Sequence, residues 1–134
     1  MNNAKGEFDV KTIPQKADNK EAEEAKLGRM SLDKEFHGGL KAISKGEMIY
    51  AGTDVEGSGV YVALERITGS LDGKTGSFIL HHTGIMTRGT PSLNVTVLPD
   101  SGTGELSGLA GTMTIKIEGG KHFYEFSYTL PGKN

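Results

Sequence analysis

Apolar side chains recur at every second position through most of this chain, and this spacing limits its fold more than any other feature does. Successive side chains of a β-strand point to opposite faces of the sheet, so residues two apart share one face. Each apolar set with this spacing therefore predicts the buried face of one strand. The sets are Phe8 and Val10; Met30, Leu32, Lys34 and Phe36; Met48 and Tyr50; Phe78, Leu80, His82 and Met86; Leu93, Val95 and Val97; Leu109, Met113, Ile115 and Ile117; and Tyr124, Phe126, Tyr128 and Leu130.

Turn signals rich in glycine separate these sets and indicate how the strands are connected. The chain has 20 glycines in 134 residues, about twice the typical ~7%, which suits turns, bulges and sharp strand bends. Asp72-Gly73 and Gly119-Gly120 are typical of two-residue hairpins. Because most connections are short, sequential strands are expected to be antiparallel neighbours.

The predicted architecture is an all-β single domain over residues 1–134, a closed antiparallel barrel of about eight strands in a mainly up-and-down meander. An open meander would leave two unpaired edges, and closing the sheet removes them. A sandwich of two sheets is the alternative. At most one short helix is expected, over residues 18–26, where Asp18 could cap the first turn and Gly28 could end the last. Because that segment is highly charged and has no apolar stripe, we favour a solvated connection over a lid across the barrel mouth.

Charge and cysteine content exclude several classes of protein. The 15 basic and 17 acidic residues give a formal net charge of -2, so no strong field of one sign attracts nucleic acid or an anionic membrane. The absence of cysteine excludes disulfides, thiolate metal sites and cysteine nucleophiles. The first residues do not resemble a signal peptide, and no apolar run reaches the ~20 residues of a membrane helix. We therefore expect a cytoplasmic protein with no cofactor, no nucleic-acid partner and no membrane partner.

Two charged residues fall on faces that are otherwise apolar, and they are the main candidates for function. Glu65 shares a face with Tyr61, and Lys34 shares one with Phe36. Inside a barrel, loss of water would raise the pKa of Glu65, which would suit a general acid or base. The alternative is a buried structural network in which Glu65 pairs with Lys34 or with a tyrosine. We favour this alternative because structural ion pairs often mimic active sites.

Histidines supply further candidate side chains. His82 shares a face with Phe78 and is predicted to point inward, whereas His81 points outward, so the adjacent pair does not suit one metal ion. Glu65, His82 and His122 could meet in space, but no spacing requires a metal site there, and a hydrogen-bonded structural histidine is favoured. We therefore predict no metal site.

Tyrosines add polar tips to the predicted interior, because Tyr61, Tyr124 and Tyr128 all lie on inward-facing sets. An apolar and aromatic pocket with few polar atoms is the usual site for a small ligand. In a filled core, each hydroxyl would instead find a local partner. The candidate catalytic pair is Glu65 and His82, and the candidate ligand-binding residues are Lys34, Tyr61, Glu65, His82 and Tyr124.

Several longer strings resemble an uncharacterised bacterial family, the domain of unknown function 3224. They lie at residues 29–34, 44–48, 61–69, 76–84 and 99–106, and the resemblance extends from about Gly6 to Leu130. It implies a β-barrel like that of allene oxide cyclase and no known activity. The family pattern usually has glutamine at the position of His81 but matches His82, which further weakens any role for His81. No functional residue of the cyclase-like barrels can be mapped onto this chain.

Three functions follow from these observations, in order of preference. The first is a barrel that binds a small hydrophobic or amphipathic molecule, with Lys34, Glu65 and His82 as its polar anchors. The second is a cofactor-independent cyclase or isomerase, in which Glu65 acts as the base and His82 or a tyrosine orients the substrate. The third is a structural or interaction module that forms a homodimer, because the strand at residues 60–68 is apolar on both faces.

Overall fold

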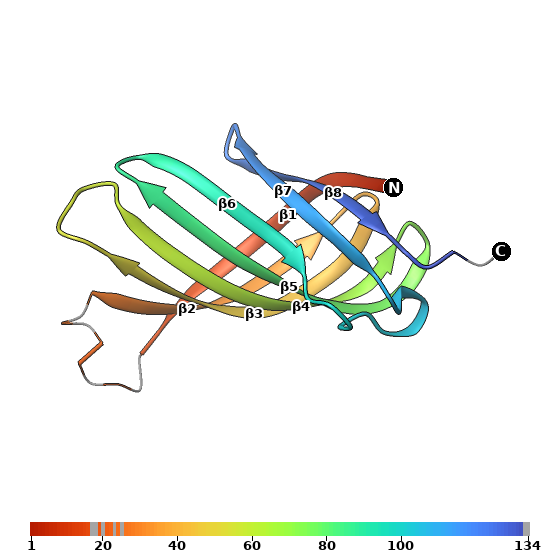
Figure 1. Cartoon of the computed structure of the whole chain (residues 1–134), viewed down its shortest axis with the longest axis horizontal. Helices are drawn as coiled ribbons and strands as arrows, with labels where there is room; N and C mark the ends of the chain where they lie inside the picture. The colour runs from red at the N-terminus through yellow and green to blue at the C-terminus, as the bar shows by residue number, and fades with distance from the viewer. Residues whose placement is uncertain (17–18, 20, 23, 25, 133–134) are drawn as a thin grey trace.

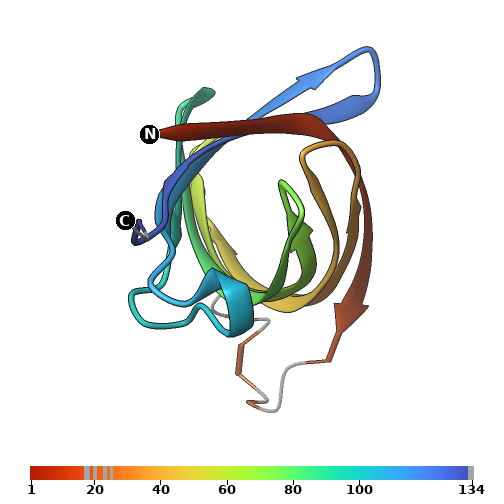
Figure 2. The ribbon, with the colours of Figure 1, turned by 90° about the vertical axis from the view of Figure 1, so that its right-hand side faces the viewer.

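The computed structural model describes residues 1–16, 19, 21–22, 24 and 26–132. It is a closed antiparallel barrel of eight strands, in which each strand pairs with its sequence neighbours and the first strand pairs with the last. Figure 1 shows the barrel from the side, and Figure 2 shows the strands curving round one interior. The predicted closed meander is confirmed, and the alternative sandwich is not observed. The candidate helix at residues 18–26 has four of its nine positions outside the described residues, so that prediction falls beyond what the structure describes.

The elements in chain order are β1 (Asn2–Gln15), β2 (Leu27–Phe36), β3 (Leu40–Gly52), β4 (Gly59–Leu71), β5 (Lys74–Thr87), β6 (Thr90–Val97), the 3₁₀ turn η1 (Gly104–Leu106), β7 (Ala110–Glu118) and β8 (Lys121–Thr129). Asp72 and Gly73 join β4 to β5 with φ angles of 48° and 86°, and Gly119 and Gly120 join β7 to β8 with 59° and 79°. Positive φ at both central residues defines the type I′ hairpin, so both predicted tight turns are confirmed. Within the described residues, no helix is long and apolar enough to cross a membrane.

The barrel interior is filled at the end that carries the β2–β3 and β4–β5 turns. The rings of Phe78 and Phe126 stack with centroids 5.8 Å apart, and Tyr128 stacks on Phe126. The Tyr128 hydroxyl donates a hydrogen bond to Asp72 in the β4–β5 turn. Other buried side chains that fill this end are Ala4, Phe36, Leu40, Leu71, Leu80, Leu106 and Leu109. The inward faces predicted from the alternation are therefore the faces that form the core.

The barrel wall has a weak side, from β6 through β7 and β8 to β1, where two of the strand pairings are short. Among the described pairings, only Val95 with Met113 and Thr96 with Thr112 join β6 to β7. The pairing of β8 with β1 ends at Phe8. Within these pairings, residues 90–94 and 9–15 therefore have a strand neighbour on one side only. This side of the wall is shorter than the side formed by β2 to β5.

Candidate functional site

Strand register gathers four polar side chains in the barrel interior. Lys34 of β2 lies directly opposite Ser44 of β3. Glu65 of β4 and His82 of β5 follow on the next two strands at neighbouring levels, and side chains at opposed or diagonal positions on one face are within reach of each other. Gly46 stands opposite Glu65, where a Cβ would lie 2.7 Å from the Cβ of Glu65. The four side chains therefore converge from four consecutive strands.

Glu65 is the centre of this cluster and accepts three hydrogen bonds. Its Oε2 accepts one from Lys34 Nζ at 2.8 Å and one from His82 Nε2 at 2.5 Å, and its Oε1 accepts one from Ser44 Oγ at 2.6 Å. Glu65 is 1% exposed and His82 is 4% exposed. The favoured pairing of Lys34 with Glu65 is confirmed, and so is the inward position of His82.

The pKa of Glu65 is lowered, not raised. Burial by itself raises it, but the hydrogen bond from His82 and the positive charge of Lys34 outweigh burial and bring the pKa to about 2. The expected increase is therefore wrong, because the sequence does not reveal how many donors converge on one buried carboxylate. Glu65 stays ionised at neutral pH, and its occupied oxygens hold its neighbours in place instead of facing a ligand.

Tyr61 extends the cluster toward the open end of the barrel. Its hydroxyl lies 3.4 Å from His82 Nδ1. Gly84 stands opposite Tyr61 on β5, and a Cβ at Gly84 would come within 2.1 Å of the Tyr61 ring. Glycine at this position thus leaves the space that the ring occupies. Burial and the nearby charge of Glu65 raise the pKa of the Tyr61 hydroxyl, so it stays protonated at neutral pH.

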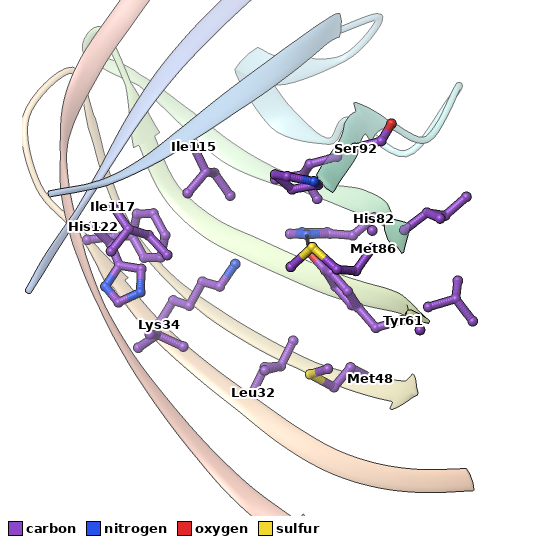
Figure 3. Close-up of a pocket in the computed structure, with 18 residues that line it drawn as sticks. Leu32, Lys34, Met48, Tyr61, His82, Met86, Ser92, Ile115, Ile117 and His122 are labelled. Atoms are coloured by element: carbon purple, nitrogen blue, oxygen red, sulfur yellow. Dashed lines mark hydrogen bonds between the residues drawn. The ribbon is translucent and has the colours of Figure 1, made fainter. Parts of the chain in front are cut away.

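A pocket of about 480 Å³ lies beside this cluster. The polar side chains that line it are Lys34, Tyr61, His82, Ser92 and His122 (Figure 3). In Figure 3, Leu32 and Met48 lie across the cavity from Ile115. The remaining apolar wall includes Phe8, Val10, Met86, Leu93 and Ile117. The arrangement is an apolar cavity with a small polar end.

The structure places Tyr124 and His122 differently from the sequence prediction. The Tyr124 hydroxyl accepts a hydrogen bond from the Leu40 N–H at 2.9 Å and donates one to the His37 carbonyl at 2.7 Å, and Tyr124 is not among the described residues that line the pocket. The structure therefore does not bring Tyr124 to this pocket, because alternation predicts an inward direction but not a level along the barrel axis. His122, weighed only as a metal ligand, lines the pocket. Sequence spacing does not single out Ser44, since an inward serine carries no distinctive signal.

A group with metal-ligand geometry lies on the outer surface, at Asp9, Glu35 and His37. His37 Nε2 is 3.1 Å from a carboxylate oxygen of Asp9 and 3.8 Å from one of Glu35. All three residues are exposed, and exposed groups of this kind are common without an ion. Within the described residues, Glu65, His82 and His122 do not form such a group.

Comparison with known proteins identifies a family for this chain. The family described as "Protein of unknown function (DUF3224)" matches residues 4–128. The chain belongs to the DUF3224 family. A crystal structure described as a protein with unknown function from the DUF3224 family of Shewanella oneidensis MR-1 is 51% identical, with a TM-score of 0.91, and the match covers 98% of this chain and 99% of that chain. No curated protein matches.

The family resemblance found in the sequence is therefore confirmed, while the likeness to allene oxide cyclase stays a prediction. Neither the DUF3224 description nor that of the Shewanella relative states an activity.

Proposed function

We propose that this DUF3224 barrel binds one small hydrophobic or amphipathic molecule in the open end of its interior. The observation that carries the proposal is the pocket of about 480 Å³, which falls within the ~300–1,000 Å³ typical of ligand sites. Its walls are mainly apolar, so a ligand body would be stabilised by ~25 cal/mol for each Å² of apolar surface removed from water. The few polar side chains in the pocket would orient the ligand.

The weak side of the barrel wall supports access to this pocket. Pro91, Ser92 and Leu93 line the pocket from the part of β6 that lacks a described neighbour on the β7 side. Phe8 and Val10 line it from β1, at and beyond the point where the pairing with β8 ends. A ligand could therefore enter past side chains without breaking the ladders of β2 to β5.

A cofactor-independent cyclase or isomerase is the second candidate, supported by the convergence of titratable groups beside the pocket. The geometry changes the roles that such an enzyme would use. Glu65 is buried behind its donors, whereas Tyr61 and His82 line the cavity. In an enzyme of this kind, Tyr61 and His82 would contact the substrate, and Glu65 would orient His82.

A homodimer is the third candidate, supported by the outer faces of β3, β4 and β5. Val60, Val62 and Leu64 are 41%, 49% and 60% exposed on the outer side of β4. Ile49 lies opposite Val62, and Ile85 lies opposite Val60, so the five side chains form one outer apolar patch. Exposed apolar patches of this kind are typical of interaction surfaces. A second copy of the chain would cover the patch.

The neutral fluorescent dye N-phenyl-1-naphthylamine tests the binding proposal. Leu93 lines the pocket mouth, so Leu93→Trp would occupy part of it, while the adjacent Asn94 is exposed and not among the residues that line the pocket. Asn94→Trp is therefore the matched control. We expect saturable one-to-one binding by the wild type and by Asn94→Trp, and binding at least about ten-fold weaker by Leu93→Trp. No binding by the wild type, or equal binding by all three proteins, would contradict the proposal.

A further inference from the structure

The chain of contacts from Glu65 to Tyr61 sets the direction of each hydrogen bond along it. An ionised carboxylate only accepts hydrogen bonds. His82 Nε2 lies 2.5 Å from Glu65 Oε2, so Nε2 must carry the hydrogen that this contact requires. Glu65 therefore fixes which ring nitrogen of His82 is protonated.

Charge balance in the cluster favours an uncharged His82 ring. Lys34 Nζ lies 2.8 Å from the same Glu65 oxygen, so these two side chains already cancel each other's charge. Lys34, Glu65 and His82 are all buried, and a second cation there would have no counter-charge. A neutral ring with hydrogen on Nε2 has a lone pair on Nδ1, which can only accept.

That lone pair orients the hydroxyl of Tyr61. The Tyr61 oxygen lies 3.4 Å from His82 Nδ1, and a tyrosine hydroxyl has one hydrogen to give. With the hydrogen directed at Nδ1, the lone pairs of the Tyr61 oxygen remain for the pocket, which Tyr61 lines (Figure 3). Lys34 Nζ donates one of its three hydrogens to Glu65 and lies 5.0 Å from the centroid of the Phe8 ring. Lys34 and Ser92 also line the pocket, and they can donate to a ligand oxygen whether or not that oxygen carries a hydrogen.

We propose that the pocket selects an apolar molecule that carries a hydroxyl or N–H group and donates it to the Tyr61 oxygen. This inference rests on the proposed binding function and names the class of ligand. Tyr61 determines the specificity, and His82 and Glu65 are positioning residues because they act through it. A ligand that has only acceptor atoms would bring no hydrogen to the Tyr61 oxygen, so that oxygen would lose a partner.

Two probes that differ in one hydrogen-bond donor test this inference. 4-Propylphenol has a hydroxyl, and 4-propylanisole has the same ring and chain with the oxygen methylated. Each is titrated against bound N-phenyl-1-naphthylamine at about pH 8, where an ordinary imidazole is neutral. We expect the wild type to bind the phenol about five-fold more tightly than the anisole, and Tyr61→Phe to bind the two alike. Tyr50→Phe, which removes a hydroxyl from a residue outside the pocket lining, should keep the wild-type ratio.

The ratio of the two affinities separates positioning from simple support of the fold. Replacing Glu65 by glutamine together with Lys34 by methionine leaves His82 beside an amide, which can present either its oxygen or its N–H group to the ring. His82 Nε2 is then no longer held as a donor, so the preference for the phenol should shrink even where both probes still bind. A purely structural role would weaken both probes equally and leave the ratio unchanged, which would overturn the positioning role.

The outcomes also separate this inference from the proposed function. Equal displacement by both probes, a preference for the anisole, or a preference that survives in Tyr61→Phe would overturn the inference while leaving a binding pocket in place. Failure of the wild type to bind the dye or either probe would overturn the binding function and the inference with it.

Discussion

Replacing Glu65 by glutamine together with Lys34 by methionine removes the buried ion pair, and the clearest effect should be on how stability depends on pH. The pKa of Glu65 falls from its ordinary 4.5 to about 2 in the folded state. At ~1.4 kcal/mol per pKa unit, this difference favours the folded state by about 3 kcal/mol when the carboxyl is ionised. Because the folded-state pKa is the lower one, this stability is fully present above pH 4.5 and is lost as the pH falls through 4.5 toward 2.

Urea unfolding at pH 7 and at pH 3 measures this effect. Between these two pH values, the wild type should lose about 2 kcal/mol more of its free energy of unfolding than the double variant does. The double variant is used because removing one partner alone leaves a buried charge unpaired, at a cost of ~3–5 kcal/mol. Glu56→Gln, at an exposed position, is the control for removing a carboxylate elsewhere. If wild type and double variant lose the same free energy between pH 7 and pH 3, the buried network described above is refuted.

Two other substitutions test the geometry at separate places. Gly84→Ala should weaken 4-propylphenol binding severalfold, because the added Cβ would lie 2.1 Å from the Tyr61 ring. The control is Gly52→Ala, whose added Cβ would meet nothing within 4 Å and which should bind like the wild type. Equal affinities of the two variants would show that the position of the Tyr61 ring does not depend on Gly84. Val62→Lys places a charge at the centre of the outer apolar patch and should convert a dimer to a monomer in light scattering, whereas Ile43→Lys, on β3 away from that patch, should not. A wild-type monomer would remove the homodimer candidate.

Most of the fold could be predicted because one physical rule governs it. Side chains alternate along strands, so the inward positions of Phe78, Leu80 and His82 followed from spacing alone. The turns could also be predicted from the sequence, because Asp72-Gly73 readily adopts the positive φ angles that a type I′ hairpin requires. Closure followed from the cost of unpaired edges.

The site was only partly predictable because it depends on register. Spacing shows that Lys34 and Glu65 point inward, but the opposition of Lys34 to Ser44 is set by how β2 and β3 are paired. The level of each residue along the barrel axis also depends on register. Spacing alone therefore groups Tyr124 with the pocket residues, although its hydroxyl bonds to the backbone of Leu40 and His37. The donors that register brings to Glu65 decide in turn whether its pKa is lowered or raised.

A crystal structure of the protein with 4-propylphenol tests the central claim most directly. The ring should lie in the pocket among Leu32, Leu93 and Ile115, and the phenol oxygen should lie about 2.7 Å from the Tyr61 oxygen. A cavity filled by the protein's own side chains, or a probe bound only outside the barrel, would contradict the claim that this barrel holds a small molecule.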